Sequence, residues 1–271
     1  FVTEVQGGIA YHALFRDFLQ QKLLKQNPVQ FTQYHQDAAQ WFEANNQLEE
    51  AFEHYIAAGL QEEAASIAER TAHLYVAQGK AETLVRWRHL LSGTKVQAPR
   101  FFHFCAMIHR DRYQYELASM DIHTAELGFK ANHNSLGVIQ VMLTQATIEN
   151  QQGYFQRALE HAEPFSHDTS IPSNLRGYAL AIVGTSYLHL NQLEQASDLL
   201  ETSLSLWRQA GDQFAIAQLL MTLEVAYLHL GRFDAAAKCM EEVLSIRRAH
   251  GESTSIILAL NNLGYHYHLL G

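Results

Sequence analysis

In the first third of the chain, apolar side chains recur every three or four positions, in blocks separated by short polar or glycine-containing turns. This spacing places the apolar side chains of a block on one face of an α-helix. A short strand and a Gly-Gly turn are predicted within residues 1–10. Proline and glycine mark where the following helices end. The predicted helices cover residues 11–25, 31–44, 48–58, 61–77 and 80–91.

A longer period begins after residue 96. Tyr187, Tyr227 and Tyr267 follow one another at intervals of 40 residues, each in a similar local pattern. A fixed period of this size is typical of stacked helical hairpins. The tyrosines are expected at packing positions, which His109 and Glu149 occupy in the two earlier units.

Alanines mark the second helix of each unit, at spacings of 40, 38 and 40 residues. A small residue is expected where the two helices of a hairpin cross closely. These alanines are Ala118, Ala158, Ala196 and Ala236.

The fold class that follows is all-α: a right-handed superhelix, or solenoid, of tetratricopeptide-like helical hairpins. Its units are longer than the usual length of about 34 residues, so longer helices are expected. Residues 92–99 form the clearest linker, and the loop 166–174, which contains Pro172, is expected to be a hinge. Since Gly271 interrupts the third tyrosine unit and Phe1 is no start methionine, we expect a piece of a longer protein.

The charge of the chain argues against nucleic-acid binding by this segment. It carries 28 acidic and 19 basic side chains, a net charge of −9, and such a surface repels phosphate backbones. Cys105 and Cys239 match neither a disulfide framework nor a zinc pattern, which favours a cytoplasmic location. No run of about 18–20 apolar residues predicts a membrane helix.

The sequence offers no motif for catalysis. It lacks the glycine-rich phosphate-binding loops and the signatures of zinc proteases and serine hydrolases. His103 and His109 are six residues apart and do not align on one helix face, which weakens a metal site. We therefore expect no catalytic residue, no bound metal and no cofactor in this segment.

The inner surface of the superhelix is the predicted binding site, because the first helix of each hairpin lines it. Neutral hydrogen-bonding and aromatic side chains dominate there, which suits an uncharged polar ligand or a peptide segment. The expected residues are Arg100, His103, Arg110, Gln140, Thr144, Thr147, Asn150, Tyr178, Thr185, His189, Gln218, Thr222, His229, Asn261, Asn262 and Tyr265.

The N-terminal part resembles a known family. The stretch YHALFRDFLQQKL, Tyr11 to Leu23, is similar to the closing helix of the winged-helix domain in large ATP-binding LuxR-family regulators of the maltose-activator type. Two following motifs of that family are matched residue by residue. The first is matched by His35, Ala38, Ala39, Trp41, Phe42 and Glu43, and the second by Glu50, Ala51, His54, Ala57, Ala58 and Gly59.

This resemblance implies a regulator of the STAND class, in which a nucleotide-binding domain, a winged helix, a superhelical sensor and an output domain follow one another. ATP would bind upstream of Phe1, and a LuxR-type helix-turn-helix would lie downstream of Gly271. The resemblance also implies a homo-oligomer on activation. It divides this chain into the end of the winged helix (1–27), a helical-hairpin arm (28–95) and a sensor superhelix (96–271).

Two functional hypotheses remain open at this point. In the first, the chain is the non-catalytic sensor region of an ATP-dependent LuxR-type transcriptional regulator, and its groove receives a small-molecule inducer or a regulatory partner. In the second, it is a plain scaffold that binds a peptide or a helix of another protein.

Overall fold

The computed structural model describes residues 2–5, 8–249, 260 and 263–264. The chain forms two compact units, which are described separately below. Unit 1 contains residues 1–112 and 123–128, and unit 2 contains residues 113–122 and 129–271. Helix α7 (Tyr115–Ala131) has residues in both. Tyr267, Asn261, Asn262 and Tyr265 lie outside the described residues.

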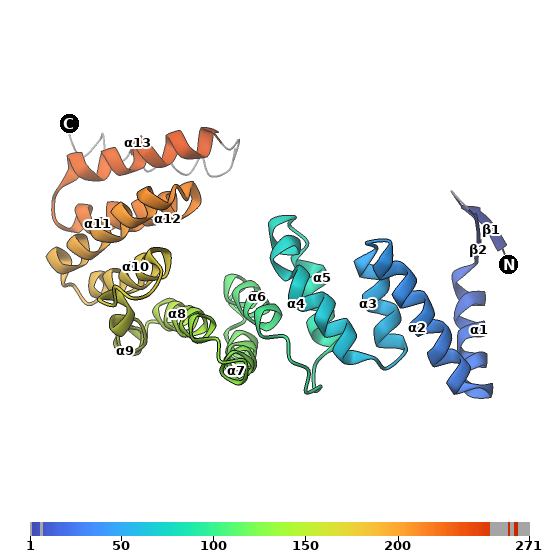
Figure 1. The fold of residues 1–271 in the computed structure, drawn as a ribbon. Helices are drawn as coiled ribbons and strands as arrows, with labels where there is room; N and C mark the ends of the chain where they lie inside the picture. The colour runs from blue at the N-terminus through green and yellow to red at the C-terminus, as the bar shows by residue number, and fades with distance from the viewer. Residues whose placement is uncertain (1, 6–7, 250–259, 261–262, 265–271) are drawn as a thin grey trace. The chain divides into compact units, whose positions relative to one another are not determined.

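Unit 1 begins with a small antiparallel hairpin and continues with helices (Figure 1). Strands β1 (Val2–Val5) and β2 (Gly8–Tyr11) pair with Val2 opposite Tyr11. The helices are α1 (Ala13–Gln26), α2 (Pro28–Ala44), α3 (Leu48–Ala57), α4 (Gln61–Ala77), α5 (Ala81–Leu90) and α6 (Pro99–Asp111).

The helices predicted for the first 91 residues are confirmed, with boundaries that differ from the predicted ones by up to three residues. Helix α2 begins at Pro28 rather than at residue 31, because the Asn27 side chain accepts a hydrogen bond from the Gln30 amide at 3.1 Å. Proline suits the first position of a helix, where its missing N–H costs nothing. No helix or strand covers residues 92–98, as predicted for the linker.

Stacked aromatic rings form the centre of unit 1. Phe52 of α3 and Trp87 of α5 are fully buried, and their rings stack at 4.2 Å with an angle of 11°. Tyr75 of α4 meets Trp87 edge-on, with ring centroids 5.1 Å apart. Such offset and edge-on contacts add to the stabilisation from burying the rings. Three consecutive helices are therefore joined at one point.

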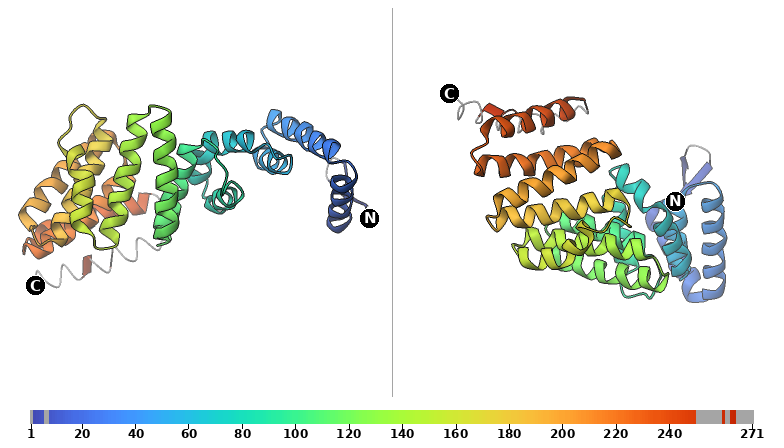
Figure 2. Two further views of the ribbon diagram at one scale, coloured as in Figure 1. Left: turned by 90° about the horizontal axis from the view of Figure 1, so that it is seen from below. Right: turned by 60° about the vertical axis from the view of Figure 1, so that its left-hand side comes forward.

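Unit 2 contains three consecutive hairpins, whose helices stack side by side in Figure 2. Every pair of helices consecutive along this part of the chain is in contact, and α10 also contacts α8 and α12. The hairpins are α8 (Ser135–Gln151) with α9 (Phe155–Ser166), α10 (Ser173–His189) with α11 (Leu193–Ala210), and α12 (Gln213–His229) with α13 (Phe233–Ala249).

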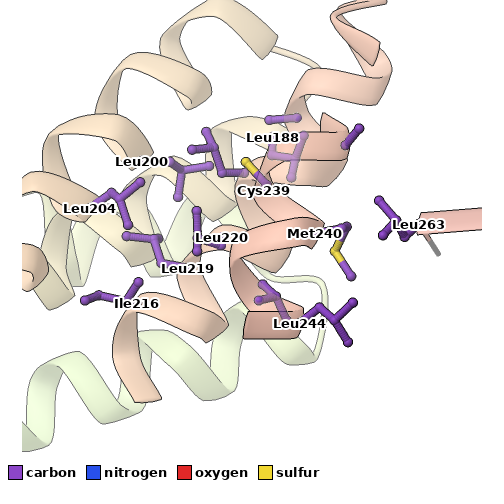
Figure 3. Close-up of a cluster of buried hydrophobic side chains, with 14 of the residues drawn as sticks. Leu188, Leu200, Leu204, Ile216, Leu219, Leu220, Cys239, Met240, Leu244 and Leu263 are labelled. Carbon is purple, nitrogen blue, oxygen red and sulfur yellow. The ribbon is translucent and has the colours of Figure 1, made fainter. Parts of the chain in front are cut away.

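The core of unit 2 repeats with the sequence period. Leucines of α11 and α12 pack against Cys239 and Met240 of α13 in the cluster of Figure 3. The four periodic alanines, Ala118, Ala158, Ala196 and Ala236, are fully buried. At Gly184, which precedes a periodic tyrosine, an added Cβ would lie 2.8 Å from the Leu200 side chain. Small residues are therefore required where the helices cross, as predicted.

The structure is thus an all-α solenoid of tetratricopeptide-like hairpins, preceded by one strand pair. The division at residues 27 and 95 into a winged-helix remnant, an arm and a sensor stays a prediction. The contacts themselves divide the chain within α7.

Candidate binding face

Charged side chains are distributed unevenly over the hairpins of unit 2. Glu149 is the only Asp, Glu, Lys or Arg of α8, and Glu224 is the only one of α12. Both are buried, at 4% and 5% exposed. Helix α10 carries only Arg176, which is half-buried. The second helices, by contrast, carry several exposed charges each; on α11 these include Glu194, Asp198, Glu201 and Arg208.

This distribution follows from packing. Helix α10 is in contact with α8, α9, α11 and α12, so most of its circumference is covered. A helix that neighbours cover on several sides is apolar or neutral around most of its surface. The remaining open side of the three first helices is consequently uncharged. We call the exposed and half-buried residues on this side of α8, α10 and α12 the first-helix face.

Helix α12 presents the most open part of this face. Phe214, Gln218, Met221, Val225 and His229 are all exposed, and their spacing places them within an arc of about 100° around the helix. Phe214 is 64% exposed, Met221 37% and Val225 39%. This part of the face therefore combines three apolar side chains with an amide and an imidazole.

Helices α8 and α10 are tied together on the same face. The hydroxyl groups of Thr147 and Tyr178 lie 2.7 Å apart, and both side chains are half-buried. Gln140, on α8, is exposed. The Tyr178 ring is thus held in a fixed position, since its hydroxyl is bonded to the neighbouring hairpin.

Two of the predicted binding residues make hydrogen bonds within the helical scaffold instead. Thr144 is 2% exposed and donates its hydroxyl to the Gln140 carbonyl at 3.0 Å. Asn150 donates its amide to the Ile182 carbonyl at 3.0 Å and accepts the Ser186 hydroxyl at 2.7 Å. Thr144 is buried, and the side-chain amide of Asn150 is bonded through both its nitrogen and its oxygen. Neither residue therefore belongs to the candidate face.

The other predicted residues of unit 2 keep part of their hydrogen-bonding capacity. Thr185 and Thr222 are half-buried, and each donates its hydroxyl to a carbonyl one turn earlier, at 2.7 and 3.4 Å. The His189 ring is exposed and stacks on Phe155 at 4.7 Å with an angle of 9°. Gln140, Gln218 and His229 are the most open polar groups of the predicted set.

Arg100, His103 and Arg110 of α6 lie in unit 1, so the structure does not join them to the face of unit 2. Arg100 is exposed, and Arg110 forms an ion pair with Asp111 at 2.8 Å. Burial, together with nearby Arg110, lowers the pKa of His103 to about 4, so this imidazole is neutral at physiological pH. Asn261 and Asn262 lie outside the described residues.

The residues predicted from the sequence are polar or aromatic and do not include the exposed apolar residues of α12. Their signal in the sequence was the helical spacing of Phe214, Met221 and Val225 with Gln218 and His229. That spacing alone did not separate exposed apolar residues from core residues. Leu136, one turn before Gln140 on α8 and 42% exposed, extends the same pattern.

The periodic tyrosines lie at packing positions. Tyr187 and Tyr227 are half-buried against the core, and each hydroxyl donates to a glutamate of the preceding hairpin. The partners are Glu163 at 3.2 Å and Glu201 at 2.8 Å. At the equivalent position of the earlier hairpin, Glu149 pairs with His161 at 2.8 Å. These residues link helices and are not part of the face.

Among the described residues, no group of three or more His, Cys, Asp or Glu side chains is placed to hold a metal ion. The helices of the described ranges are also too short or too polar to cross a membrane.

Residues 178–249, which run from α10 to the end of α13, match the tetratricopeptide repeat family. No curated protein matches the sequence.

Solved structures of similar fold include two complexes and one free protein. NprR in complex with its cognate peptide NprX has a TM-score of 0.63 at 14% identity, over 91% of this chain and 76% of NprR. The apo form of the quorum sensor NprR from B. thuringiensis has a TM-score of 0.60 at 13% identity, over 91% and 74%. A Rap protein complexed with Competence and Sporulation Factor has a TM-score of 0.61 at 13% identity, over 95% and 85%. At these identities the similarity shows the fold.

Proposed function

We propose that this chain is a non-catalytic binding region whose first-helix face in unit 2 takes an uncharged, partly apolar segment of a peptide or protein. The observation that carries the proposal is the absence of exposed Asp, Glu and Lys side chains from α8, α10 and α12 as described. The second helices around them are rich in charge.

The chemistry of the face selects among ligands. The amides of Gln140 and Gln218 can each donate to and accept from the backbone of an extended segment. Phe214, Met221 and Val225 offer exposed apolar contact area beside them. One cation stands at the Phe214 end of the face, where the Arg247 guanidinium of α13 lies 5.7 Å from the centre of the Phe214 ring. Beside Gln140 and Gln218, helices α8, α10 and α12 offer a charged ligand group no exposed Asp, Glu or Lys, and an unpaired desolvated charge is costly. The face therefore favours neutral segments and discriminates against acidic or basic ones.

The similar structures make a peptide the first ligand class to test. NprR was solved with its cognate peptide and shares the fold of this chain at a TM-score of 0.63. Fold similarity at 14% identity transfers no ligand, so the neutral face supports the proposal, and NprR is an example of this fold with a bound peptide.

A second candidate function sets this region within a larger regulator. The motif that includes His35 and Trp41 favours the LuxR-type, ATP-dependent class, with ATP bound upstream and an inducer on the solenoid. Ligand binding would then shift an equilibrium between closed and open states, which requires different affinities for the two. Oligomerisation on activation and contacts with the other domains of the parent chain belong to this candidate. A thermal-shift screen of the chain with sugars and metabolites tests the inducer, because a bound ligand raises the melting temperature.

The peptide proposal is tested by selecting binders from a random peptide display library and measuring their affinity for the 271-residue chain. Selected peptides should be neutral and contain apolar side chains. Gln218→Glu, on the face, should weaken their binding about tenfold or more, because it adds an unpaired charge. Gln195→Glu, the same change at an exposed position of α11, is the matched control and should bind as the unmodified chain does. Selection of strongly charged peptides, or equal affinities of the two variants, would overturn the proposal.

A further inference from the structure

Two histidines from neighbouring helices of unit 1 face each other directly. The Nδ1 atom of His35 on α2 lies 3.0 Å from the Nδ1 atom of His54 on α3, and both side chains are half-buried. Aromatic rings enclose the pair. Phe31 packs on the His35 ring at 4.4 Å, and Phe42 stacks on the His54 ring at 5.2 Å.

A hydrogen bond between two Nδ1 atoms limits how many protons the pair can hold. One nitrogen must donate and the other must accept, so at least one imidazole has to be neutral at Nδ1. The bond persists with one extra proton on the pair. With two extra protons both Nδ1 atoms are donors, the bond is lost, and two positive charges stand next to each other between aromatic rings.

The surrounding charges do not compensate for a second proton. Glu53, next to His54, raises the pKa of that histidine, but burial outweighs it and the pKa is lowered. Glu53 is itself paired with Arg86 at 3.0 Å. Glu43, on the same helix as His35, is bonded to Tyr55 of α3 and to Arg70 of α4. The charged residues of α1, which packs against α2, are Arg16, Asp17, Lys22 and Lys25, and they shift the pKa of neither histidine.

We propose that His35 and His54 form a proton-sensitive latch that holds α2 against α3 at neutral pH and releases this contact when both imidazoles become protonated. Its release would loosen the α2–α3 hairpin, on which α4 packs through α3. Nothing in the binding face of unit 2 is needed for this device.

The direction of the pH effect follows from the two pKa values. Burial lowers both from the ordinary 6.5, and the neighbouring His54 lowers that of His35 further. The unfolded hairpin thus binds more protons than the folded one once the pH falls below about 6.5. The latch is fully closed above that pH, and its contribution is lost progressively as the pH falls through the lowered pKa values.

The test is hydrogen exchange of the 271-residue chain at pH 7.5 and pH 5, corrected for the intrinsic exchange rate. Amides of residues 28–57 should lose about tenfold in protection for each unit by which the pKa of the pair is lowered. Amides of α10 and α11, in unit 2, should change less. His54→Gln keeps a donor and an acceptor without a titrating ring, and it should remove the extra loss at pH 5. His73→Gln, at an exposed site on α4, should behave as the unmodified chain does.

A titration of the histidine ring protons by nuclear magnetic resonance keeps the proposal testable if His54→Gln does not fold. Two imidazoles of the unmodified chain, assigned with the help of His35→Gln, should titrate below pH 6.5 as a coupled pair. The latch is wrong if the two rings titrate independently at ordinary values. It is also wrong if residues 28–57 lose no more protection than α10 does, or if folded His54→Gln keeps the full pH dependence.

Discussion

The two units join successive helices by different means. In unit 1, charged side chains bridge helices that are about one hairpin apart in the sequence. Lys80 pairs with Glu49 at 2.8 Å, Arg86 with Glu53 at 3.0 Å and Arg112 with Glu82 at 2.6 Å, while Arg70 pairs with Glu43. These side chains are half-buried or exposed.

In unit 2 the corresponding links include hydrogen bonds donated by hydroxyl groups. Thr147 with Tyr178, Asn150 with Ser186, and Tyr227 with Glu201 connect one hairpin to the next. One exposed ion pair, Arg208 with Glu242 at 2.6 Å, joins second helices. The remaining cohesion comes from the periodic core of alanine and leucine.

The difference shows how a solenoid keeps one surface free of charge. An exposed ion pair contributes about 0–1 kcal/mol, so unit 1 depends mainly on its buried aromatic stack. Unit 2 carries most of its exposed charges on the second helices, since the charged residues of α8, α10 and α12 (Glu149, Arg176 and Glu224) are buried or half-buried. Hydroxyl and amide groups link its first helices. This arrangement leaves an uncharged face available for a ligand.

The largest effect is expected from the core of unit 2. Leu200 is fully buried in the cluster of Figure 3, so Leu200→Ala should lower the free energy of unfolding of unit 2 by about 2–5 kcal/mol. Leu190→Ala, at a site 39% exposed, is the control and should cost far less.

The two buried cysteines report on the units separately. Burial, with Glu242 nearby, raises the pKa of Cys239 to about 12, so this thiol is alkylated only after unit 2 opens. Cys105 lies in unit 1. Leu200→Ala should speed the labelling of Cys239 in dilute urea more than that of Cys105. An equal increase in the labelling rates of both thiols would mean that the two units open together, and the contrast between them would be wrong.

An intermediate effect is expected from the periodic tyrosines. Tyr227→Phe removes the hydroxyl that donates to Glu201 at 2.8 Å, and it should cost about 0.5–1.5 kcal/mol in urea unfolding. Tyr154→Phe, at a site 52% exposed, provides the comparison and should be close to neutral. If Tyr227→Phe were equally neutral, the tyrosine position would act through packing alone.

The smallest effect is expected from salt. Raising sodium chloride from 0.05 to 0.5 M should weaken the exposed ion pairs of unit 1, by up to about 1 kcal/mol in total, and should affect unit 2 less. Hydrogen exchange of α4 and α5 against α10 and α11 measures this difference. Arg86→Gln should reduce the salt response of unit 1, and an equal loss of protection in both units would contradict the contrast.

The helices and their period could be derived from the sequence. Apolar spacing predicted α4 at residues 61–77, as observed, and the 40-residue period placed Ala196 and Ala236 at closely packed crossings. These properties depend on neighbours along the chain and on repetition, which a single sequence displays directly.

Tertiary structure decided which of the predicted polar residues face outward. A helix position does not reveal what the adjacent hairpin covers: Asn150 is occupied by the Ile182 carbonyl, 32 residues away. The pairing of His35 with His54, and the exposure of Phe214 and Val225, likewise depend on how the helices pack. The sequence determined a repeating helical scaffold in which the first helices α8, α10 and α12 carry one charged residue each. Only packing decided which of their neutral side chains remain open, because burial is set by contacts between residues far apart in the chain.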